Sequence, residues 1–346
     1  MAEPIRIGGK DIAPGTRQTI DLPLPRLYTH TPLSMPVHVI RGKRDGPRLF
    51  VTAAIHGDEL NGVEIIRRVL KHKTLQRLRG MLVVIPMVNV YGVLHHSRYL
   101  PDRRDLNRSF PGSERGSLAA RLAHLFMEEI VAHCTHGIDL HTAAIHRSNL
   151  PQVRGNLDDP ETERLARAFS VPVVIDSRLR DGSLREAVHL KGIPMLVYEA
   201  GEALRFDELS IRAGVRGVIH VMQSLGMLPK SRRTRPPAEP FVAHASHWVR
   251  APESGILRTL TPLGVRIKKG AVLGLVSDAF GERETEIKAP FGGIVIGRTN
   301  LPLIHEGEAT FHIARFEDVG EVAQQLENFQ TDHEEEPIIP GEPPIV

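Results

Sequence analysis

The stretch "RLFVTAAIHGDELNGVEII" (48–66) joins an apolar run to a helix-like pattern and places two ionisable residues at the joint. Residues 48–55 have the length and the β-branched content of a buried parallel strand. Over 63–71 the apolar residues recur with helical spacing. Ligand sites in open α/β sheets lie beyond the carboxyl ends of the strands. His56 and Glu59, which directly follow the strand, therefore mark a candidate functional site.

Strand-like runs and helical patterns continue to alternate along the first two thirds of the chain. The further strand candidates are 81–88, 171–175 and 194–199, and the further helix candidates are 117–134, 161–169 and 211–225. Such alternation is typical of an α/β domain with a mainly parallel sheet. We predict this domain over residues 1–230.

The pattern changes after this domain. Residues 231–240 lie in a basic, proline-rich stretch that predicts a linker. Short β-like runs split by glycines follow and predict a small β-domain over 241–316. Two similar segments, "APESGIL" (251–257) and "APFGGIV" (289–295), suggest that this domain has two similar halves. The tail, 317–346, is acidic and rich in proline, and we expect it to be partly disordered.

The small β-domain resembles the hammerhead scaffold of biotinyl and lipoyl carriers. In those carriers the modified lysine lies in a turn about seven residues before the position of Ala289. Glu282 stands there in this chain, and the turn "AFGER" (279–283) holds no lysine. The scaffold is therefore predicted without the carrier chemistry.

Composition excludes several classes of function. With 44 Lys+Arg against 41 Asp+Glu, the formal charge is only +3, which gives no electrostatic case for nucleic acid. Cys134 is the only cysteine, so any metal must take His, Asp or Glu ligands. The chain has no run of 18 apolar residues and no signal-peptide pattern at its start. We expect a cytoplasmic protein without membrane contact, and a homo-oligomer is compatible with the sequence.

A third candidate ligand follows another short strand. The segment "GIDLH" (137–141) is apolar and ends in His141. Two ligands close together and one distant histidine are typical of a catalytic zinc site, which keeps its fourth position open. We predict one Zn²⁺ per chain on His56, Glu59 and His141. Asp139 lies on the same face of the strand as His141 and is a candidate to orient a ligand imidazole.

Two more segments carry candidate chemistry. The loop "SRYLPDRRDLNRSFPG" (97–112) holds four arginines, follows strand 81–88 and is too polar for a core. A guanidinium group fits a carboxylate through two parallel hydrogen bonds, so this loop is a candidate anion site. In "MLVYEAGE" (195–202), Glu199 ends an apolar strand, where an acid is costly unless it is partnered or functional. Glu202 has a more polar setting and is expected to be solvated.

Four stretches together resemble the succinylglutamate desuccinylase/aspartoacylase family, a branch of the zinc carboxypeptidase-like enzymes. They are "HGDE" (56–59), "DLNRSFPG" (105–112), "DLH" (139–141) and "YEAG" (198–201), and the resemblance runs over about 48–225. The small β-domain is also similar to the C-terminal domain of that family.

The resemblance implies a role for each matching residue. Zinc would bind to His56, Glu59 and His141, and Glu199 would be the acid/base residue. Asn107 and Arg108 would hold a substrate carboxylate. The family also uses an upstream arginine to polarise the scissile carbonyl, for which Arg98 is our choice and Arg103 and Arg104 are alternatives. The candidates for further substrate-binding arginines are Arg147 and Arg154.

The expected function is zinc-dependent removal of an acyl group from an N-acyl amino acid or a related small, carboxylate-bearing amide. A zinc carboxypeptidase that acts on short peptides would use the same metal and the same carboxylate anchor. A third reading is a carrier or interaction protein built on the β-domain. The missing lysine argues against a carrier, and the combination of His56, Glu59, His141 and Glu199 argues against a scaffold without activity.

Overall fold

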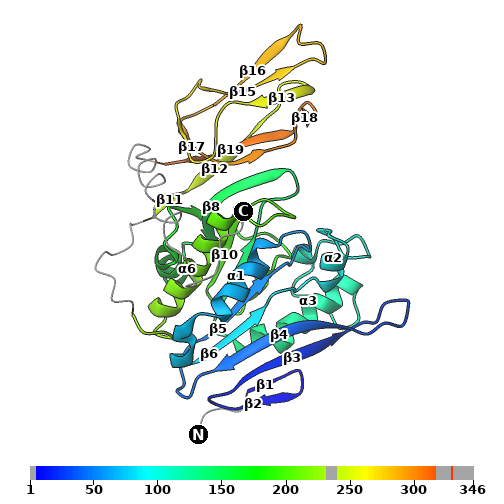
Figure 1. Ribbon diagram of the computed structural model, residues 1–346, viewed down its shortest axis with the longest axis vertical. Coiled ribbons are helices and arrows are strands. Elements are labelled where there is room, and N and C mark those ends of the chain that lie inside the picture. Colours follow the sequence, from blue (N-terminus) through cyan, green and yellow to red (C-terminus); the bar gives the residue numbers. More distant parts are fainter. Residues whose placement is uncertain (1–4, 231–239, 317–328, 330–346) are drawn as a thin grey trace.

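The computed structural model describes residues 5–230, 240–316 and Phe329. Its main feature is a mixed sheet of 13 strands (Figure 1). The strands on its main path are, in spatial order, β12 (Ala245–Arg250), β19 (Ala309–Arg315), β17 (Gly293–Thr299), β8 (Arg147–Gly155), β10 (Met195–Gly201), β7 (His136–His141), β5 (Arg48–Ala53), β6 (Met81–Ile85), β4 (Leu33–Arg41) and β3 (Arg17–Leu24). Off this path lie β9 (Val173–Asp176), β11 (Phe241–Ala243) and β14 (Arg266–Ile267).

The centre of the sheet is parallel and its flanks are antiparallel. Strand β5 pairs in parallel with β6 and β7, and β7 pairs in parallel with β10. Towards the edges, β4 pairs with β6 and β8 with β10 in antiparallel ladders. The predicted α/β class is confirmed, but the expectation of a mainly parallel sheet holds only for the centre. The four strands predicted from apolar runs correspond to β5, β6, β9 and β10.

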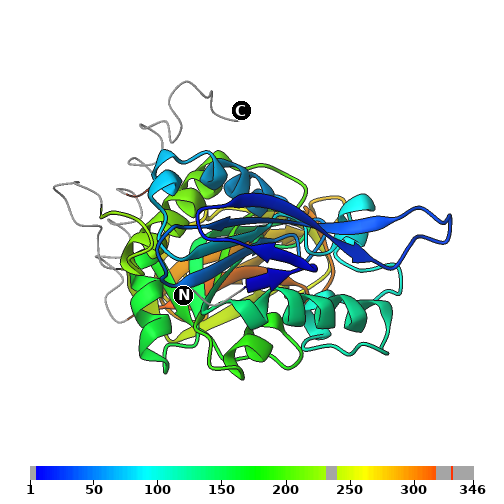
Figure 2. The same ribbon diagram turned by 90° about the horizontal axis from the view of Figure 1, so that it is seen from below.

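Helices cover both faces of the parallel centre, as Figure 2 shows. One face packs against α1 (Asn61–Leu70), α4 (Pro160–Phe169) and α6 (Glu208–Ser224). The other packs against α3 (Leu118–Glu129) and α5 (Leu184–His189). Two covered faces explain why β5 and β6 are almost continuously apolar. Helices α3, α4 and α6 begin where Ser117, Asp159 and Asp207 accept a backbone N–H of the first turn.

The C-terminal β-rich part is hydrogen-bonded into the main sheet. Strand β17 pairs with β8, so β17, β19 and β12 extend the sheet beyond the parallel centre (Figure 1). A separate sheet holds, in spatial order, β16 (Glu284–Lys288), β15 (Val272–Ser277), β13 (Gly255–Thr259) and β18 (Leu303–Ile304). One apolar cluster contains residues of β8, β9, β17 and β19 and joins the two parts. This junction places β12 near the carboxyl edge of the parallel strands.

The predicted domain limits and the hammerhead resemblance stay predictions. Strand β11 lies just inside the predicted β-domain, but it pairs with β9 of the first part. The predicted linker and tail lie outside the described residues, apart from Pro240 and Phe329. Across the described ranges, no helix combines the length and the apolar character that a bilayer crossing needs. The cytoplasmic location also stays a prediction.

Candidate active site

His56, Glu59 and His141 form one buried cluster at the carboxyl edge of the sheet. One ligand atom from each residue lies within 4.8 Å of the others. Nδ1 of His56 is 2.7 Å from Oε1 of Glu59, and Nδ1 of His141 is 2.7 Å from Oε2 of the same carboxylate. His141 ends β7 and His56 follows β5, so the pairing of these two parallel strands brings the histidines together. Two imidazole nitrogens and one carboxylate oxygen are a donor set that suits zinc.

Each histidine has a second carboxylate behind it. Nε2 of His141 is 2.6 Å from Oδ2 of Asp139, whose other oxygen accepts a hydrogen bond from Thr52 Oγ1 at 2.9 Å. Nε2 of His56 lies 3.2 Å from Oδ1 of Asp105, though without the alignment of a hydrogen bond. These contacts turn both Nδ1 atoms towards Glu59, as carboxylates behind metal-binding histidines do. The sequence predicts this position for Asp139 but not for Asp105.

The cluster is held by opposite charges in a buried place. Burial favours the neutral form of Glu59, but the facing imidazoles of His56 and His141 hold the pKa of its carboxyl well below the usual range. Burial lowers the pKa of His141, but the charges of Asp139 and Glu59 outweigh it and raise that pKa well above the usual value. A cation between the Nδ1 atoms and Glu59 would replace the protons that now link them.

Close backbone packing fixes the loop that carries His56. A Cβ atom on Gly57 would lie 2.0 Å from the carbonyl carbon of Gly92 in α2 (Val90–Leu94). We expect Gly57→Ala to lower the free energy of unfolding by about 1–3 kcal/mol, because the loop must move away from α2. Gly292→Ala is the matched control, since its nearest neighbour would be 3.4 Å away. Equal stability of the two variants in urea unfolding would contradict this packing account.

Arg98 is the arginine of the 97–112 loop that reaches the cluster. Its Nη2 donates to Asp105 Oδ2 at 2.9 Å, and its Nη1 lies 3.5 Å from Glu59 Oε1. The alternatives Arg103 and Arg104 are exposed, and neither lines the cavity next to the cluster. The geometry therefore favours Arg98 over both alternatives.

The cluster opens into a cavity of about 690 Å³ that also contains Glu199. Glu199 lies opposite His141 in the parallel ladder of β10 and β7. Its Oε2 accepts a hydrogen bond from Asn149 Nδ2 at 2.8 Å and lies 3.3 Å from Arg154 Nη2. Glu202 does not line the cavity. It was expected to be solvated, yet its carboxylate accepts hydrogen bonds from His146 N and Asn300 Nδ2 at 3.2 and 2.9 Å.

Arginines form most of the polar wall of this cavity. Every substrate-binding candidate from the sequence lines it: Asn107, Arg108, Arg147 and Arg154. Three arginines that sequence reasoning missed line it too: Arg178, Arg180 and Arg185. Burial and the neighbouring charge of Arg154 lower the pKa of Arg185 to about 10. The sequence does contain a signal for these three arginines. The loop "SRLRDGSLR" (177–185) is rich in arginine and follows a predicted strand, as the 97–112 loop does.

The far wall of the cavity comes from His244 and from β12. Trp248 stacks on His312 with ring centroids 4.6 Å apart, and the guanidinium of Arg147 lies 5.1 Å from the Trp248 ring centre. The stack lies within the ladder of β12 and β19, and the Arg147 contact links β12 to the first residue of β8. No local pattern in the sequence marked β12, because its place depends on the pairing of distant strands.

Cys134 is buried away from this site, and burial raises the pKa of its thiol to about 12, which makes it a poor nucleophile.

Fold and site together define an α/β enzyme with a candidate His–Glu–His metal centre. The chain belongs to the succinylglutamate desuccinylase/aspartoacylase family, because residues 45–225 match the family's catalytic domain. The protein is accordingly a hydrolase of the deacylase class, which acts on amide bonds.

Individual relatives extend this finding. N-alpha-acetyl-L-2,4-diaminobutyric acid deacetylase from Halomonas elongata is 26% identical over 294 residues, which cover 81% of this chain and 85% of that protein. A succinylglutamate desuccinylase/aspartoacylase from Rhodobacter sphaeroides has a TM-score of 0.79 at 23% identity, and the match covers 90% of this chain and 99% of that one. The product-bound ectoine utilization protein EutE (DoeB) from Ruegeria pomeroyi has a TM-score of 0.78 at 22% identity, over 86% and 95% of the two chains. At these identities the two structures show a shared fold.

Proposed function

We propose that the protein is a zinc-dependent deacylase that hydrolyses an N-acyl amino acid or a related small, carboxylate-bearing amide. One observation carries this proposal: the buried cluster of His56, Glu59 and His141 opens into the cavity that holds Glu199 and the arginine wall. A metal, an acid/base residue and an anion anchor are the parts that such a reaction needs.

The residues around the cluster divide the chemical work. Zinc held by His56, Glu59 and His141 would supply Lewis acidity and favour ionisation of water at this place. Glu199 accepts a proton from the attacking water and returns it to the leaving amine. Arg98 donates hydrogen bonds to the oxygen that gains charge as the carbonyl is attacked. Both residues line the same cavity as the cluster.

The charges of the other lining residues determine which substrate charge the cavity favours. Seven arginines line it, against three acids, of which Glu59 and Glu199 belong to the catalytic machinery. The remaining acid, Asp176, lies 3.5 Å from His244. This excess of fixed positive charge favours a substrate with one or more carboxylates. We infer that Asn107 and Arg108 hold one of them, which positions the amide for attack. An N-acetylated amino acid, as the name of the Halomonas relative describes, falls within this class.

The size of the cavity supports a small substrate over a peptide. His244 and Trp248 line the cavity together with the arginines, and Arg147 packs over Trp248. A peptide would need an open path for its chain beyond the scissile bond. We infer that the residues of β12 that line the cavity, Ala245 to Trp248, restrict that path.

Arg108 provides the test of the proposed function. Lysine keeps the charge but loses the planar fork, so Arg108→Lys should lower kcat/KM by about 10- to 100-fold, the value of one charge-assisted interaction. Arg104→Lys is the matched control, because Arg104 lies in the same loop but does not line the cavity. The assay compares N-acyl amino acids with their carboxamide analogues.

Blocking the substrate carboxylate should cost the wild type about as much as the mutation does. The Arg108→Lys enzyme has already lost this contact, so it should barely distinguish free from blocked substrate. Independent, additive losses would mean that Arg108 and the carboxylate do not meet. A wild type that is indifferent to the blocked carboxylate would refute the N-acyl amino acid proposal.

A further inference from the structure

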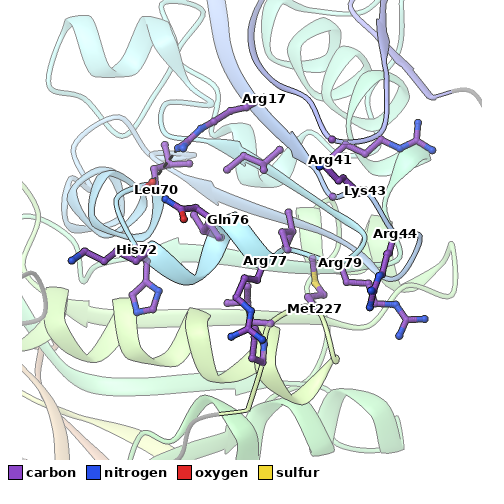
Figure 3. Close-up of a pocket in the computed structure, with 18 of the residues that line it drawn as sticks. Arg17, Arg41, Lys43, Arg44, Leu70, His72, Gln76, Arg77, Arg79 and Met227 are labelled. Atoms are coloured by element: carbon purple, nitrogen blue, oxygen red, sulfur yellow. Dashed lines mark hydrogen bonds between the residues drawn. The ribbon is translucent and has the colours of Figure 1, made fainter.

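A second hollow lies at the opposite edge of the sheet, where the parallel strands begin. It has a volume of about 810 Å³ and is shown in Figure 3. Its walls come from the end of β4, the end of α1, the 3₁₀ helix η1 (Lys73–Arg77) and the turn that follows α6. His56 follows the carboxyl end of β5, whereas Arg79 and Gly80 precede the first residue of β6. The hollow is therefore distinct from the candidate active site.

The lining of this hollow is strongly basic. Eight permanently charged side chains line it: Arg17, Arg41, Lys43, Arg44, Lys71, Lys73, Arg77 and Arg79. No Asp or Glu occurs among the described residues that line it. We call these eight residues and the hollow between them the basic basin.

Some of these cations have a structural task. Arg17 donates to the Leu70 carbonyl at the end of α1 at 3.0 Å, and Arg41 donates to the Ile12 carbonyl at 2.6 Å. Four others have exposed side chains with no hydrogen bond or ion pair to any residue that the structure describes: Lys43, Arg44, Lys73 and Arg77. Asp45 lies 3.8 Å from Arg41 but does not line the hollow, and the like charges of the four cations without a described partner repel one another. An anion in the basin would relieve that repulsion.

Backbone hydrogen bonds connect the segments that carry the cations of the basin. Gly42 N donates to Gly80 O and Gly80 N donates to Arg44 O, both at 2.8 Å, and Arg79 N donates to Met227 O at 2.9 Å. A Cβ atom on Gly42 would lie 2.2 Å from the Leu78 carbonyl oxygen, so this close approach requires glycine. The buried residues of the lining include the apolar Leu75, Leu78, Met227 and Leu228 as well as Arg41.

We propose that the basic basin binds a small ligand with a chain of phosphate groups, either free polyphosphate or a nucleoside triphosphate. Four cations without a described partner match the charge of such a chain. Arginine is suited to phosphate because its fork donates two parallel hydrogen bonds. A nucleoside would add contacts with the apolar residues of the lining, so the two sources of the same chemistry should differ in affinity. A basin lined by cations also raises the local concentration of anions.

Calorimetric titration of the full-length protein with tripolyphosphate and with ATP tests the proposal. We expect one binding event per chain, and its affinity should fall as salt is added.

Arg44→Ala and Arg77→Ala should each weaken the binding by about 10- to 100-fold, as the loss of one charge-assisted interaction does. Both side chains are exposed, so neither change threatens the fold. Arg283→Ala, at an exposed arginine outside the basin, is the matched control. Tighter binding of ATP would identify a nucleotide site, and equal affinities would identify the phosphate chain as the recognised part.

The arginine-rich active site could also attract these probes, and Trp248 separates the two sites. It is the only tryptophan of the chain and lines the active-site cavity. Binding in the basin should leave its fluorescence unchanged while the calorimetric signal saturates. A fluorescence change with the same midpoint, no binding by the wild type, or equal affinity of Arg77→Ala and Arg283→Ala would each overturn the proposal. Binding that appears only in the full-length variant E334Q/E335Q/E336Q would also overturn it, because the chain's own acidic segment would then be the occupant.

Discussion

Glu199→Gln should lower kcat by about 10²- to 10⁴-fold, the contribution of a positioned acid/base group. Glutamine has the same shape and keeps an oxygen for the hydrogen bond from Asn149 Nδ2, which is 2.8 Å long. The amide cannot take a proton from water at neutral pH, so the chemical step should fail while fold and metal content stay normal. Rates at saturating substrate, with metal analysis of the same sample, measure this effect.

Glu202→Gln is the control for that substitution. Glu202 lies three residues further along, outside the cavity, and its carboxylate accepts hydrogen bonds from His146 N and Asn300 Nδ2. Its replacement should cost some stability at the junction of the two parts of the chain but leave most of kcat. If Glu202→Gln lost more activity than Glu199→Gln, the acid/base role would belong to a different residue.

The position of Arg154 gives Glu199 a stabilising partner that the sequence did not suggest. Sequence reasoning proposed Arg154 as a substrate-binding residue, whereas the structure places its guanidinium 3.3 Å from the Glu199 carboxylate. This ion pair, together with the hydrogen bond from Asn149, holds the Glu199 carboxylate in place. Arg154 can serve both purposes only if the substrate carboxylate lies next to Glu199.

The sequence predicted the parts of this protein whose signals are local. The run 48–55 is buried on both faces and becomes β5, and the helical spacing of 63–71 corresponds to α1. His56 and Glu59 were found because a strand end and a helix start mark the carboxyl edge of a sheet. The motif residues fall near one another for the same reason, since β5, β7 and β10 are neighbours in one sheet.

Features that depend on distant pairing were not predicted. The antiparallel strands β3 and β4 form one edge of the sheet, but their alternating pattern was not recognised. The contact of β17 with β8 joins residues about 150 positions apart, and it helps to bring Trp248 to the cavity. Asp105 belongs to the motif 105–112, yet its position 3.2 Å from His56 Nε2 depends on how the 97–112 loop folds back. Local composition does not encode such contacts.

Removal of one metal ligand should abolish both zinc and activity. We predict one zinc per chain on His56, Glu59 and His141, with distances near 2.0–2.2 Å to nitrogen and oxygen. His141→Ala leaves two ligands. It also removes the imidazole that contacts the buried carboxylates of both Glu59 and Asp139. We expect the zinc content to fall to roughly a tenth or less of the wild-type value, with activity lost in parallel.

His136→Ala is the matched control, because His136 begins the same strand that His141 ends. Its Nε2 lies 3.4 Å from Glu161 Oε1, at the opposite end of the strand and outside the cavity, so zinc and activity should persist. Asp139→Asn should have an intermediate effect. It keeps the three ligands but weakens the hold on His141 Nε2, and the loss of such a partner typically costs 10- to 100-fold in metal affinity.

The combination of these variants separates a metal centre from a purely ionic cluster. In a metal centre, zinc content should decrease from wild type through Asp139→Asn to His141→Ala, and activity should follow it in the same order. An ionic cluster without metal would show no zinc in any variant, and the three proteins would differ in stability alone. Full zinc content in His141→Ala would move the metal elsewhere, and the mechanism through Glu199 would lose its basis, because that carboxylate lies next to His141 in the sheet.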